Sequence, residues 1–457
     1  MNKKDDMALL EDAARRGIRY LLASRERSVA PAADAVAALE RFREPLSEQG
    51  DQPADVLAML DTLGSPATMA TTSPRFFGFV IGGALPVTVA SNWLTTAWDQ
   101  NVAMHAVTPA AAMLERVSAE WLIDLFGLPP ESGYAFVSGA TVANFTALAA
   151  ARNRVYADIG WNVEADGLIA APPVTVVVGA EAHPTLTKAL GLLGFGRNRV
   201  VRVPVDGQGR LDVTQLPDIV GPTIICTQAG NINTGAFDPI DEICDRAKPH
   251  GAWVHVDGAF GLWAAASPQL AHLARGVARA DSWATDAHKW LNVPYDSGLA
   301  FVRDSEALKR AMAITADYLP TASTQRNPAD FTPELSRRAR GVDVWAALKS
   351  LGRGGVAELV ERCCTHAQRF ADGLRAAGHE VLNDVVLNQV LVSFGDEEVT
   401  REVIRRVQAD GTCWCGATVW QGRTAMRISV INWSTATADV DRSIDAMLRA
   451  ASGTEGN

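Results

Sequence analysis

Cysteine is scarce in this chain. Six cysteines among 457 residues are too few for the disulfide framework of a small secreted protein. They are Cys226, Cys244, Cys363, Cys364, Cys413 and Cys415. Cys413 and Cys415 flank Trp414 in a predicted strand, and no second pair at metal-binding spacing accompanies them, so we expect no metal. The sequence therefore predicts a reducing compartment, and we expect a cytoplasmic protein.

Long apolar runs are also missing. The longest nearly uncharged stretch, residues 76–90, is broken by Gly82, Gly83 and Pro86 and is too short to cross a bilayer. Residues 1–17 are rich in acidic side chains and lack an apolar core of signal-peptide length. We therefore expect neither a membrane protein nor a secreted one.

Positive charge is in the minority. The chain has 42 lysine and arginine residues against 52 aspartate and glutamate residues, which gives a formal net charge of −10. Binding to nucleic acid or to an anionic membrane depends on basic surface. The one basic stretch, residues 336–341, is short and isolated. We therefore expect neither nucleic acid nor a membrane as a partner.

The arrangement of apolar residues predicts an α/β protein of more than one domain. Residues 1–70 have the pattern of a helical segment, and residues 71–335 alternate short apolar strands with helices. Buried strands that alternate with helices are typical of a mostly parallel sheet covered on both faces. Residues 336–457 are expected to form a smaller α+β domain of helix, antiparallel strands and helix.

Chemically active side chains follow the predicted strands, where open α/β sheets bind their ligands. After one strand, a turn of small residues leads into a helix that begins near Thr141, and the free N–H groups of such a helix can bind phosphate. His183 follows a second strand, where it can lie against an aromatic ligand or simply cap a helix. The chain has no G-x-x-x-x-G-K-[ST] sequence, so ATP is not the expected ligand.

Three further strand ends carry polar groups. Asn231 lies in a polar loop that can bind a ligand or form an ordinary turn. Asp257 closes a buried strand, where a carboxylate needs a cationic partner such as a protonated ring nitrogen. Lys289 lies in an apolar run; it is either a surface lysine or a desolvated amine that attacks carbonyls. A phosphate site, a stacking histidine, a carboxylate and an amine together meet the needs of pyridoxal 5′-phosphate.

The order of these motifs resembles that of the group II pyridoxal-phosphate-dependent amino acid decarboxylases, which include aromatic amino acid and glutamate decarboxylases. The matching segments are SGATVAN, HPTLTKAL, NTGAFDPI, HVDGAFG, DAHKWLNVPYDSG and PELSRRAR…WAALKSLGRGG, within roughly residues 70–445. The resemblance implies the type I aminotransferase fold. It also implies a homodimer with active sites at the subunit interface, in which residues 1–70 pack on the partner subunit.

The resemblance also assigns roles to single residues. Lys289 would bind the aldehyde of the cofactor covalently, Asp257 would pair with the pyridinium nitrogen, and His183 would stack on the ring. Ala259 would pack on the opposite ring face, and Asn231 would lie near the ring hydroxyl. The phosphate would be held by Ala140, Thr141 and His288.

The remaining roles concern the substrate. Tyr318 occupies the stretch where the family's decarboxylases carry, on a mobile loop, the tyrosine that protonates the carbanion left by CO2. Arg427 would meet the substrate carboxylate through a guanidinium pair. Phe79 and Trp98 would line the substrate cavity, and such an aromatic wall favours an aromatic or large apolar amino acid.

The predicted activity is the decarboxylation of an L-amino acid to an amine and CO2. Two alternatives stay open: other pyridoxal-phosphate chemistry on the same fold (aldehyde synthesis, transamination or carbon–carbon cleavage), and cofactor binding without turnover. Tyr318 favours decarboxylation, because relatives with phenylalanine at this position tend toward oxidative aldehyde formation. The combination of Lys289, Asp257, His183 and Tyr318 argues against a protein without catalysis.

Overall fold

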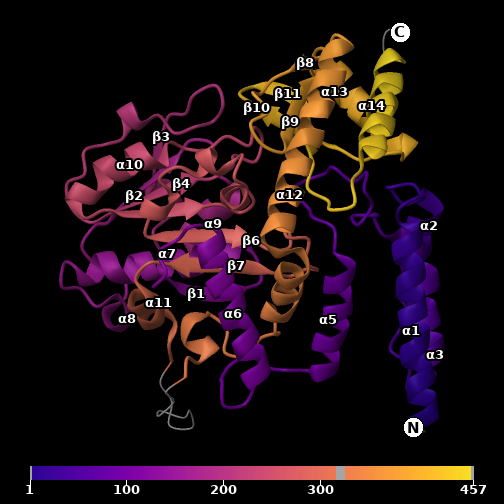
Figure 1. Ribbon diagram of the computed structural model, residues 1–457, viewed down its shortest axis with the longest axis horizontal. Helices are drawn as coiled ribbons and strands as arrows, with labels where there is room; N and C mark the ends of the chain where they lie inside the picture. Colours follow the sequence, from indigo (N-terminus) through magenta and orange to yellow (C-terminus); the bar gives the residue numbers. More distant parts are fainter. Residues whose placement is uncertain (1–2, 315–324, 454–457) are drawn as a thin grey trace. The chain divides into compact units, whose positions relative to one another are not determined.

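The structure is a computed structural model that describes residues 3–314 and 325–453 (Figure 1). The chain forms two compact units. The larger unit comprises residues 84–368 and 383–390, and the smaller unit comprises residues 1–83, 369–382 and 391–457.

The boundaries of these units differ from those predicted at residues 70/71 and 335/336. Both ends of the chain belong to the smaller unit, and helix α12 (Gly341–Ala376) contributes residues to both units. The physical reason is that hydrophobic periodicity identifies single elements along the chain. It does not identify which distant elements pack together, so a division made along the sequence misses units assembled from separate segments.

The larger unit is built on a seven-stranded sheet with the order β1-β7-β6-β5-β4-β2-β3 (Figure 1). Its strands are β1 (Gly133–Val137), β2 (Thr175–Gly179), β3 (Val201–Val203), β4 (Thr223–Gln228), β5 (Trp253–Asp257), β6 (Ser282–Asp286) and β7 (Gly298–Val302). Only β7 runs against its neighbours, and β3, β2, β4, β5 and β6 pair in parallel. The predicted α/β class with a mostly parallel sheet is confirmed.

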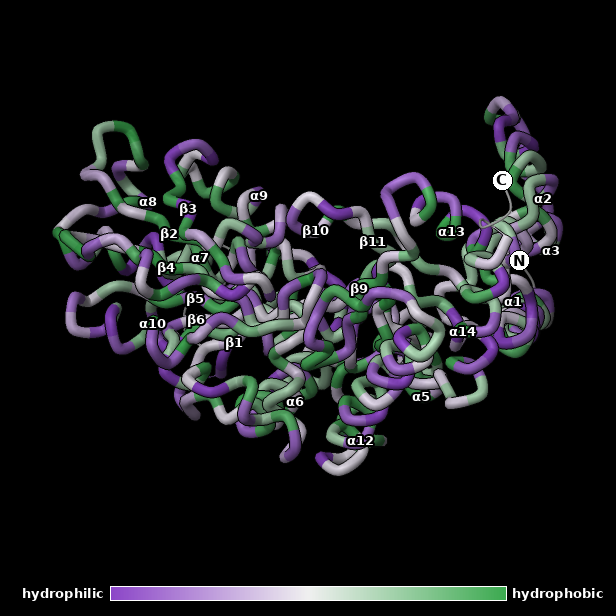
Figure 2. Tube along the Cα trace, turned by 90° about the horizontal axis from the view of Figure 1, so that it is seen from above, coloured by the Kyte–Doolittle hydropathy of each residue, from purple (hydrophilic) through white to green (hydrophobic). Residues whose placement is uncertain are grey.

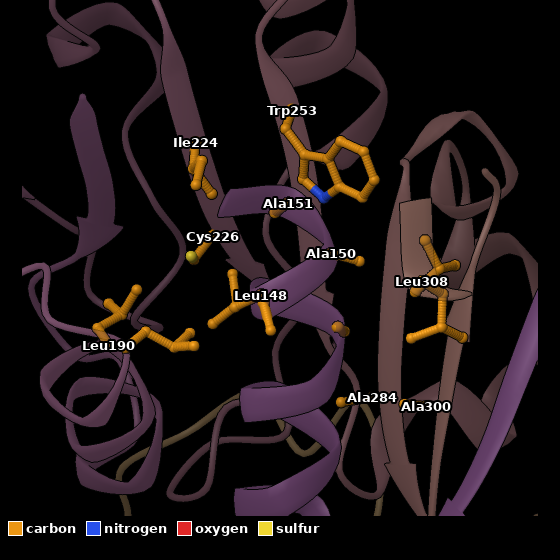
Figure 3. Close-up of a cluster of buried hydrophobic side chains, with 14 of the residues drawn as sticks. Leu148, Ala150, Ala151, Leu190, Ile224, Cys226, Trp253, Ala284, Ala300 and Leu308 are labelled. Carbon is orange, nitrogen blue, oxygen red and sulfur yellow. The ribbon is translucent and has the colours of Figure 1, made fainter. Parts of the chain in front are cut away.

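Helix α7 (Ala140–Ala157) packs on β5, β6 and β7. Small buried residues such as Ala147 let this helix lie close to the sheet. Figure 3 shows Leu148 projecting from α7 on the side of Leu190, within the same apolar cluster as Cys226 of β4. In Figure 2, hydrophobic stretches run through the inner strands of this unit, as expected for strands buried on both faces.

Other helices complete the larger unit. They are α5 (Pro86–Trp98), α6 (Pro109–Leu125), α8 (Val163–Asp166), α9 (Pro184–Leu192), α10 (Ile240–Ala247) and α11 (Ser305–Met312). Within residues 3–314 and 325–453, no helix combines the length and the hydropathy that crossing a membrane requires.

The smaller unit contains a four-stranded sheet with the order β10-β11-β9-β8. Its elements are α1 (Lys3–Ala23), α2 (Ala33–Ala37), α3 (Pro53–Met59), α4 (Ser65–Ala67), β8 (Glu380–Val381), β9 (Gln389–Ser393), α13 (Glu397–Asp410), β10 (Gly416–Trp420), β11 (Arg423–Ser429) and α14 (Thr437–Ser452). The prediction that Cys413 and Cys415 lie in a strand is wrong, because β10 begins only at Gly416.

Within the smaller unit, residues from the two ends of the sequence are bonded to each other. The N–H of Phe77 donates to the carbonyl of Trp414 over 2.9 Å, and the N–H of Ser429 donates to the carbonyl of Phe77 over 3.0 Å. The ring of Phe76 stacks on Trp414 with 5.4 Å between centroids. Arg75 donates its Nε–H to the carbonyl of Thr412 over 2.7 Å. The segment around residue 77 is therefore held by residues 412–429.

Candidate active site

A cavity of about 330 Å³ lies in the larger unit, at the carboxyl ends of three neighbouring strands. Gln228, Asp257 and Asp286, which end β4, β5 and β6, line this cavity. Because these strands are parallel and adjacent, residues far apart in sequence meet at one edge of the sheet. The turn between β1 and α7 and the start of α9 also line the cavity.

Lys289 projects into this cavity from the turn after β6. Its Nζ lies 3.1 Å from Oδ2 of Asp286, and its side chain is only 18% exposed. The neighbours Trp290 and Leu291 are buried, so the amine is attached to a rigid apolar segment. The alternative of a surface lysine is excluded by this burial. The amine is instead placed where a carbonyl group in the cavity could reach it.

Asp286 was not predicted as a site residue. It is buried, it pairs with Lys289, and its Oδ1 atom has no hydrogen-bond partner among the described residues. A buried carboxylate without its cation is costly, so Asp286 and the amine stabilise each other. The available signal was its position, three residues before Lys289 at the end of a strand of fully buried residues.

Asp257 lies at the floor of the cavity. Its Oδ1 accepts the N–H of Ala259 over 3.2 Å, and its Oδ2 accepts an N–H of Asn144 over 3.1 Å. Burial raises the pKa of Asp257 above its ordinary value, against the opposing effects of His183 and Lys289. Such a carboxyl group gains most from a cation placed directly against it in the cavity.

His183 caps a helix, which is one of the two roles that the sequence left open, and stacking on an aromatic ligand stays a prediction. It is the N-cap residue of α9, and its Nδ1 accepts the N–H of Thr185 over 3.3 Å. It also lines the cavity, close enough to Asp257 for the two to interact electrostatically. Capping the helix fixes the position of the imidazole beside the other cavity residues.

The turn between β1 and α7 has the features of a phosphate site. Ala140 and Thr141 begin an 18-residue helix, whose first N–H groups have no partner within the helix and whose dipole favours an anion. Gly139 precedes them in an extended conformation. A side chain at Gly298 would reach within 2.4 Å of the Gly139 backbone, so glycine is required there for the turn to lie against β7.

His288 can donate to an anion at this turn. Its Nδ1 accepts the N–H of Ser297 over 3.1 Å, and burial lowers its pKa, so the neutral ring carries its proton on Nε2. Nε2 lies 3.6 Å from Oδ2 of Asp286, and the ring stacks on Tyr295 with 4.2 Å between centroids. His288 lines the cavity together with Gly139, Ala140 and Thr141.

The larger unit places the remaining predicted residues as follows. Ala259 lines the cavity, but Asn231 is not among the lining residues. The Oδ1 of Asn231 accepts the N–H groups of Asn233 and Thr234 within its own loop. Trp98 ends α5, is 43% exposed, and also does not line the cavity.

The other predicted substrate residues lie elsewhere in the chain. In the smaller unit, Phe79 is 59% exposed and stacks on Trp414 with 5.7 Å between centroids. Arg427 lies on β11, and burial lowers the pKa of its guanidinium. Tyr318 lies outside the described residues. The substrate contacts of all three stay predictions.

The residues around the cavity fit pyridoxal phosphate. The turn before α7 and His288 offer donors for a phosphate, Asp257 offers a buried carboxylate for a ring nitrogen, and Lys289 offers an amine for the aldehyde. Asp257 gives specific support for this fit. Its carboxylate is buried, and a buried carboxylate is energetically costly unless a cation is bound against it.

Comparisons with known proteins agree with this chemistry. Residues 39–395 match the family model described as the pyridoxal-dependent decarboxylase conserved domain. The aromatic-L-amino-acid decarboxylase of Bacillus atrophaeus is 25% identical over 422 residues, which is 88% of this chain and 86% of that protein. The acidic amino acid decarboxylase GADL1 of Bos taurus is 30% identical over 321 residues, which is 67% of this chain and 61% of that protein.

The fold has close counterparts among solved structures. The crystal structure of Oryza sativa TDC with PLP and tryptamine superimposes with a TM-score of 0.91 at 22% identity, over 99% of each chain. At this identity the likeness shows the fold. It confirms the large α/β unit with a mostly parallel sheet that the sequence predicts.

Proposed function

Because this chain belongs to the pyridoxal-dependent decarboxylase family, and is therefore a pyridoxal-phosphate-dependent carboxy-lyase, we propose that it converts an aromatic or large apolar L-amino acid to its amine and CO2. The observation that carries the proposal is the convergence of Lys289 and Asp257 on one cavity of about 330 Å³. An amine for the cofactor and a buried carboxylate for the ring nitrogen are the two groups that this chemistry needs most.

Each residue of the site would have a separate role. When bound, pyridoxal phosphate supplies a conjugated ring that accepts the electron pair left by the departing carboxylate. Asp257 favours a protonated ring nitrogen, because its buried charge is stabilised by a cation. Lys289 would hold the cofactor through its amine, and Asp286, whose Oδ2 lies 3.1 Å from that amine, would stabilise its protonated form.

Two features support an aromatic or large apolar substrate. Phe260 and Ile232 give the cavity an apolar wall. An acidic side chain would need a guanidinium or ammonium partner, and the described residues that line the cavity include no arginine and no lysine besides Lys289, which would be taken up by the cofactor. Phe79 and Trp98 are proposed as additional walls, and Arg427 as the partner of the substrate carboxylate.

We also propose that the chain acts as a homodimer, as the family resemblance implies. Exposed apolar side chains support this proposal. Trp93, Leu94 and Trp98 are exposed on α5, and Leu10 and Leu22 are exposed on α1. Large apolar side chains gathered on one helix are typical of a surface that another protein covers.

The first test is a substrate panel. Purified protein with pyridoxal phosphate is incubated in air with each proteinogenic L-amino acid, and amine, aldehyde and 2-oxo acid are measured together by liquid chromatography and mass spectrometry. We expect amine from one or two aromatic or large apolar amino acids and from no acidic one. Amine from glutamate or aspartate alone would contradict the proposed substrate class. Aldehyde as the main product, with oxygen consumed, would contradict decarboxylation to an amine.

Tyr318→Phe tests the proposed proton donor. Without the phenol, the carbanion is protonated more slowly and has time to react with oxygen, so the rate of amine formation should fall by about 10²-fold or more while aldehyde rises. Tyr20→Phe is a matched control, because Tyr20 bonds to Thr68 within the smaller unit. An unchanged ratio of amine to aldehyde in Tyr318→Phe would show that another group supplies the proton.

A further inference from the structure

A row of buried polar side chains continues from Asp257 into the interior of the larger unit. An N–H of Asn144 donates to Oδ2 of Asp257 over 3.1 Å, and Oδ1 of Asn144 lies 2.8 Å from Nε2 of His255. Nδ1 of His255 lies 2.8 Å from Oγ of Ser282. The indole N–H of Trp253 donates to the same Oγ over 2.9 Å. Asn144, His255 and Ser282 are fully buried.

The direction of each hydrogen bond in this row follows from chemistry. An ionised carboxylate can only accept, so Asn144 turns its NH₂ group to Asp257 and its oxygen to His255. That oxygen needs a donor, so His255 carries its proton on Nε2. Burial lowers the pKa of His255 to about 3, so the ring is neutral and its Nδ1 is an acceptor. The hydroxyl of Ser282 therefore donates to Nδ1 and accepts from Trp253.

The elements that carry these residues explain why they meet. His255 and Asp257 are two residues apart on β5 and so face the same side of the sheet. Ser282 lies opposite His255 in the pairing of β5 with β6. Asn144 comes from α7, which packs on that side of both strands. The row thus connects the helix whose first turn offers the phosphate site to the carboxylate at the floor of the cavity.

A buried polar network is costly unless all its members are bonded, and apolar side chains of the same size would pack there without that cost. In the described chain, no polar side-chain atom of Asn144, His255 or Ser282 is left without a partner. All the donors in the row point toward Asp257, and this alignment favours the ionised form of that carboxyl group over the neutral one.

We propose that Asn144 and His255 are positioning residues, which keep Asp257 ionised and fixed in orientation so that it recognises a protonated ring nitrogen in the cavity. This inference rests on the proposed function, because it takes pyridoxal phosphate as the ligand. It adds two residues that touch neither the cofactor nor the substrate but act through Asp257.

The test compares two ligands on the protein and on Asn144→Leu, which is close in size but cannot donate. The ligands are pyridoxal 5′-phosphate and its 1-deaza analogue, in which a C–H replaces the ring nitrogen. We expect the Kd of pyridoxal phosphate to rise by about tenfold in the variant, since a hydrogen bond to a charged group is lost. The Kd of the deaza analogue should stay unchanged, because that ligand offers no cation to Asp257.

Further variants separate positioning from general packing. Thr227→Val is the matched control: Thr227 is buried and bonds to the carbonyl of His255, but it is not in the row that ends at Asp257. It should leave both Kd values unchanged. His255→Leu should reproduce the effect of Asn144→Leu, and His255→Gln, which keeps a donor, should restore most of the binding. An equal loss for both ligands, or no loss for either, would overturn the proposal.

One measurement needs no variant. The ¹⁵N spectrum of the whole protein should show His255 as the neutral Nε2–H tautomer across the pH range in which the protein is folded. A neutral ring with its proton on Nδ1 would reverse the direction of the row, and a charged ring near neutral pH would leave Nδ1 unable to accept from Ser282; either result would overturn the proposal. Neither the binding measurements nor the ¹⁵N spectrum depends on turnover. An enzyme that decarboxylates nothing in the panel would count against the proposed function and would still give a clear result here.

Discussion

Lys289→Ala is expected to abolish turnover and covalent attachment of the cofactor together. Among the described residues that line the cavity, Lys289 is the only lysine, so no other amine there can replace it. The variant should lose the absorbance at the edge of the visible range that we expect of the wild-type protein with pyridoxal phosphate. Its kcat should fall by about 10⁴-fold or more, as when an essential nucleophile is removed. Reduction with borohydride followed by mass spectrometry checks the attachment directly.

The matched control for this variant is Lys188→Ala. Lys188 is exposed and belongs to α9, the helix that His183 caps. It should leave absorbance, attachment and kcat unchanged. A Lys289→Ala protein that is still labelled after reduction, at a single site, would show that another lysine binds the cofactor. It would also remove the observation on which the proposed function depends.

Asp257→Asn is expected to lower kcat by about 10³-fold, the usual effect of removing one preorganised electrostatic partner, even when the cofactor is in excess. The amide keeps the shape of the carboxyl group but carries no charge, so the ring nitrogen loses the group that keeps it protonated. The KM for the amino acid should change little, because Asp257 contacts the cofactor site rather than the substrate side chain. Steady-state kinetics at saturating pyridoxal phosphate measures both constants.

The same residue predicts a pH dependence. Burial raises the pKa of Asp257, while His183 and Lys289 in their charged forms oppose that rise. The carboxylate is therefore present above this raised pKa and is lost as the pH falls through it, earlier than for an ordinary aspartate. Activity and cofactor affinity should decline on the acidic side in the wild-type protein, and Asp257→Asn should lack that decline. Full activity in Asp257→Asn would contradict the role of this charge.

Much of the site could be predicted from the sequence because it lies at strand ends. Asp257 and Lys289 follow apolar runs that are readily identified as buried strands, and parallel strands present their ends at one edge of the sheet. Asp286, Asn144 and His255 were not predicted. Asn144 is 113 residues from Asp257, and their contact depends on how α7 packs across the sheet. His255 reaches Ser282 only because the register of β5 and β6 places them opposite each other.

Parts of the fold could not be predicted for the same reason: they depend on contacts between residues that are distant in sequence. The strands and helices of residues 133–302 are local patterns and were expected from their periodicity. The composition of the two units was not expected, because it depends on contacts between distant residues. Phe77, for example, bonds to Trp414 and Ser429 far along the chain. The strand expected at Cys413 and Cys415 begins later, because Trp414 makes only an isolated bridge with Phe76 before β10 starts.

The interleaved smaller unit sets an order of events during synthesis. Residues 1–83 leave the ribosome well before their partners in residues 391–457. The larger unit, which is nearly continuous in sequence, can fold in the interval. Phe76 and Phe77, which are buried in the finished protein, must wait uncovered until Trp414 and Ser429 emerge. The nascent chain thus exposes apolar surface for a long time around Phe76 and Phe77, where a chaperone has time to bind it and where a chain that stalls before residue 414 is prone to aggregate.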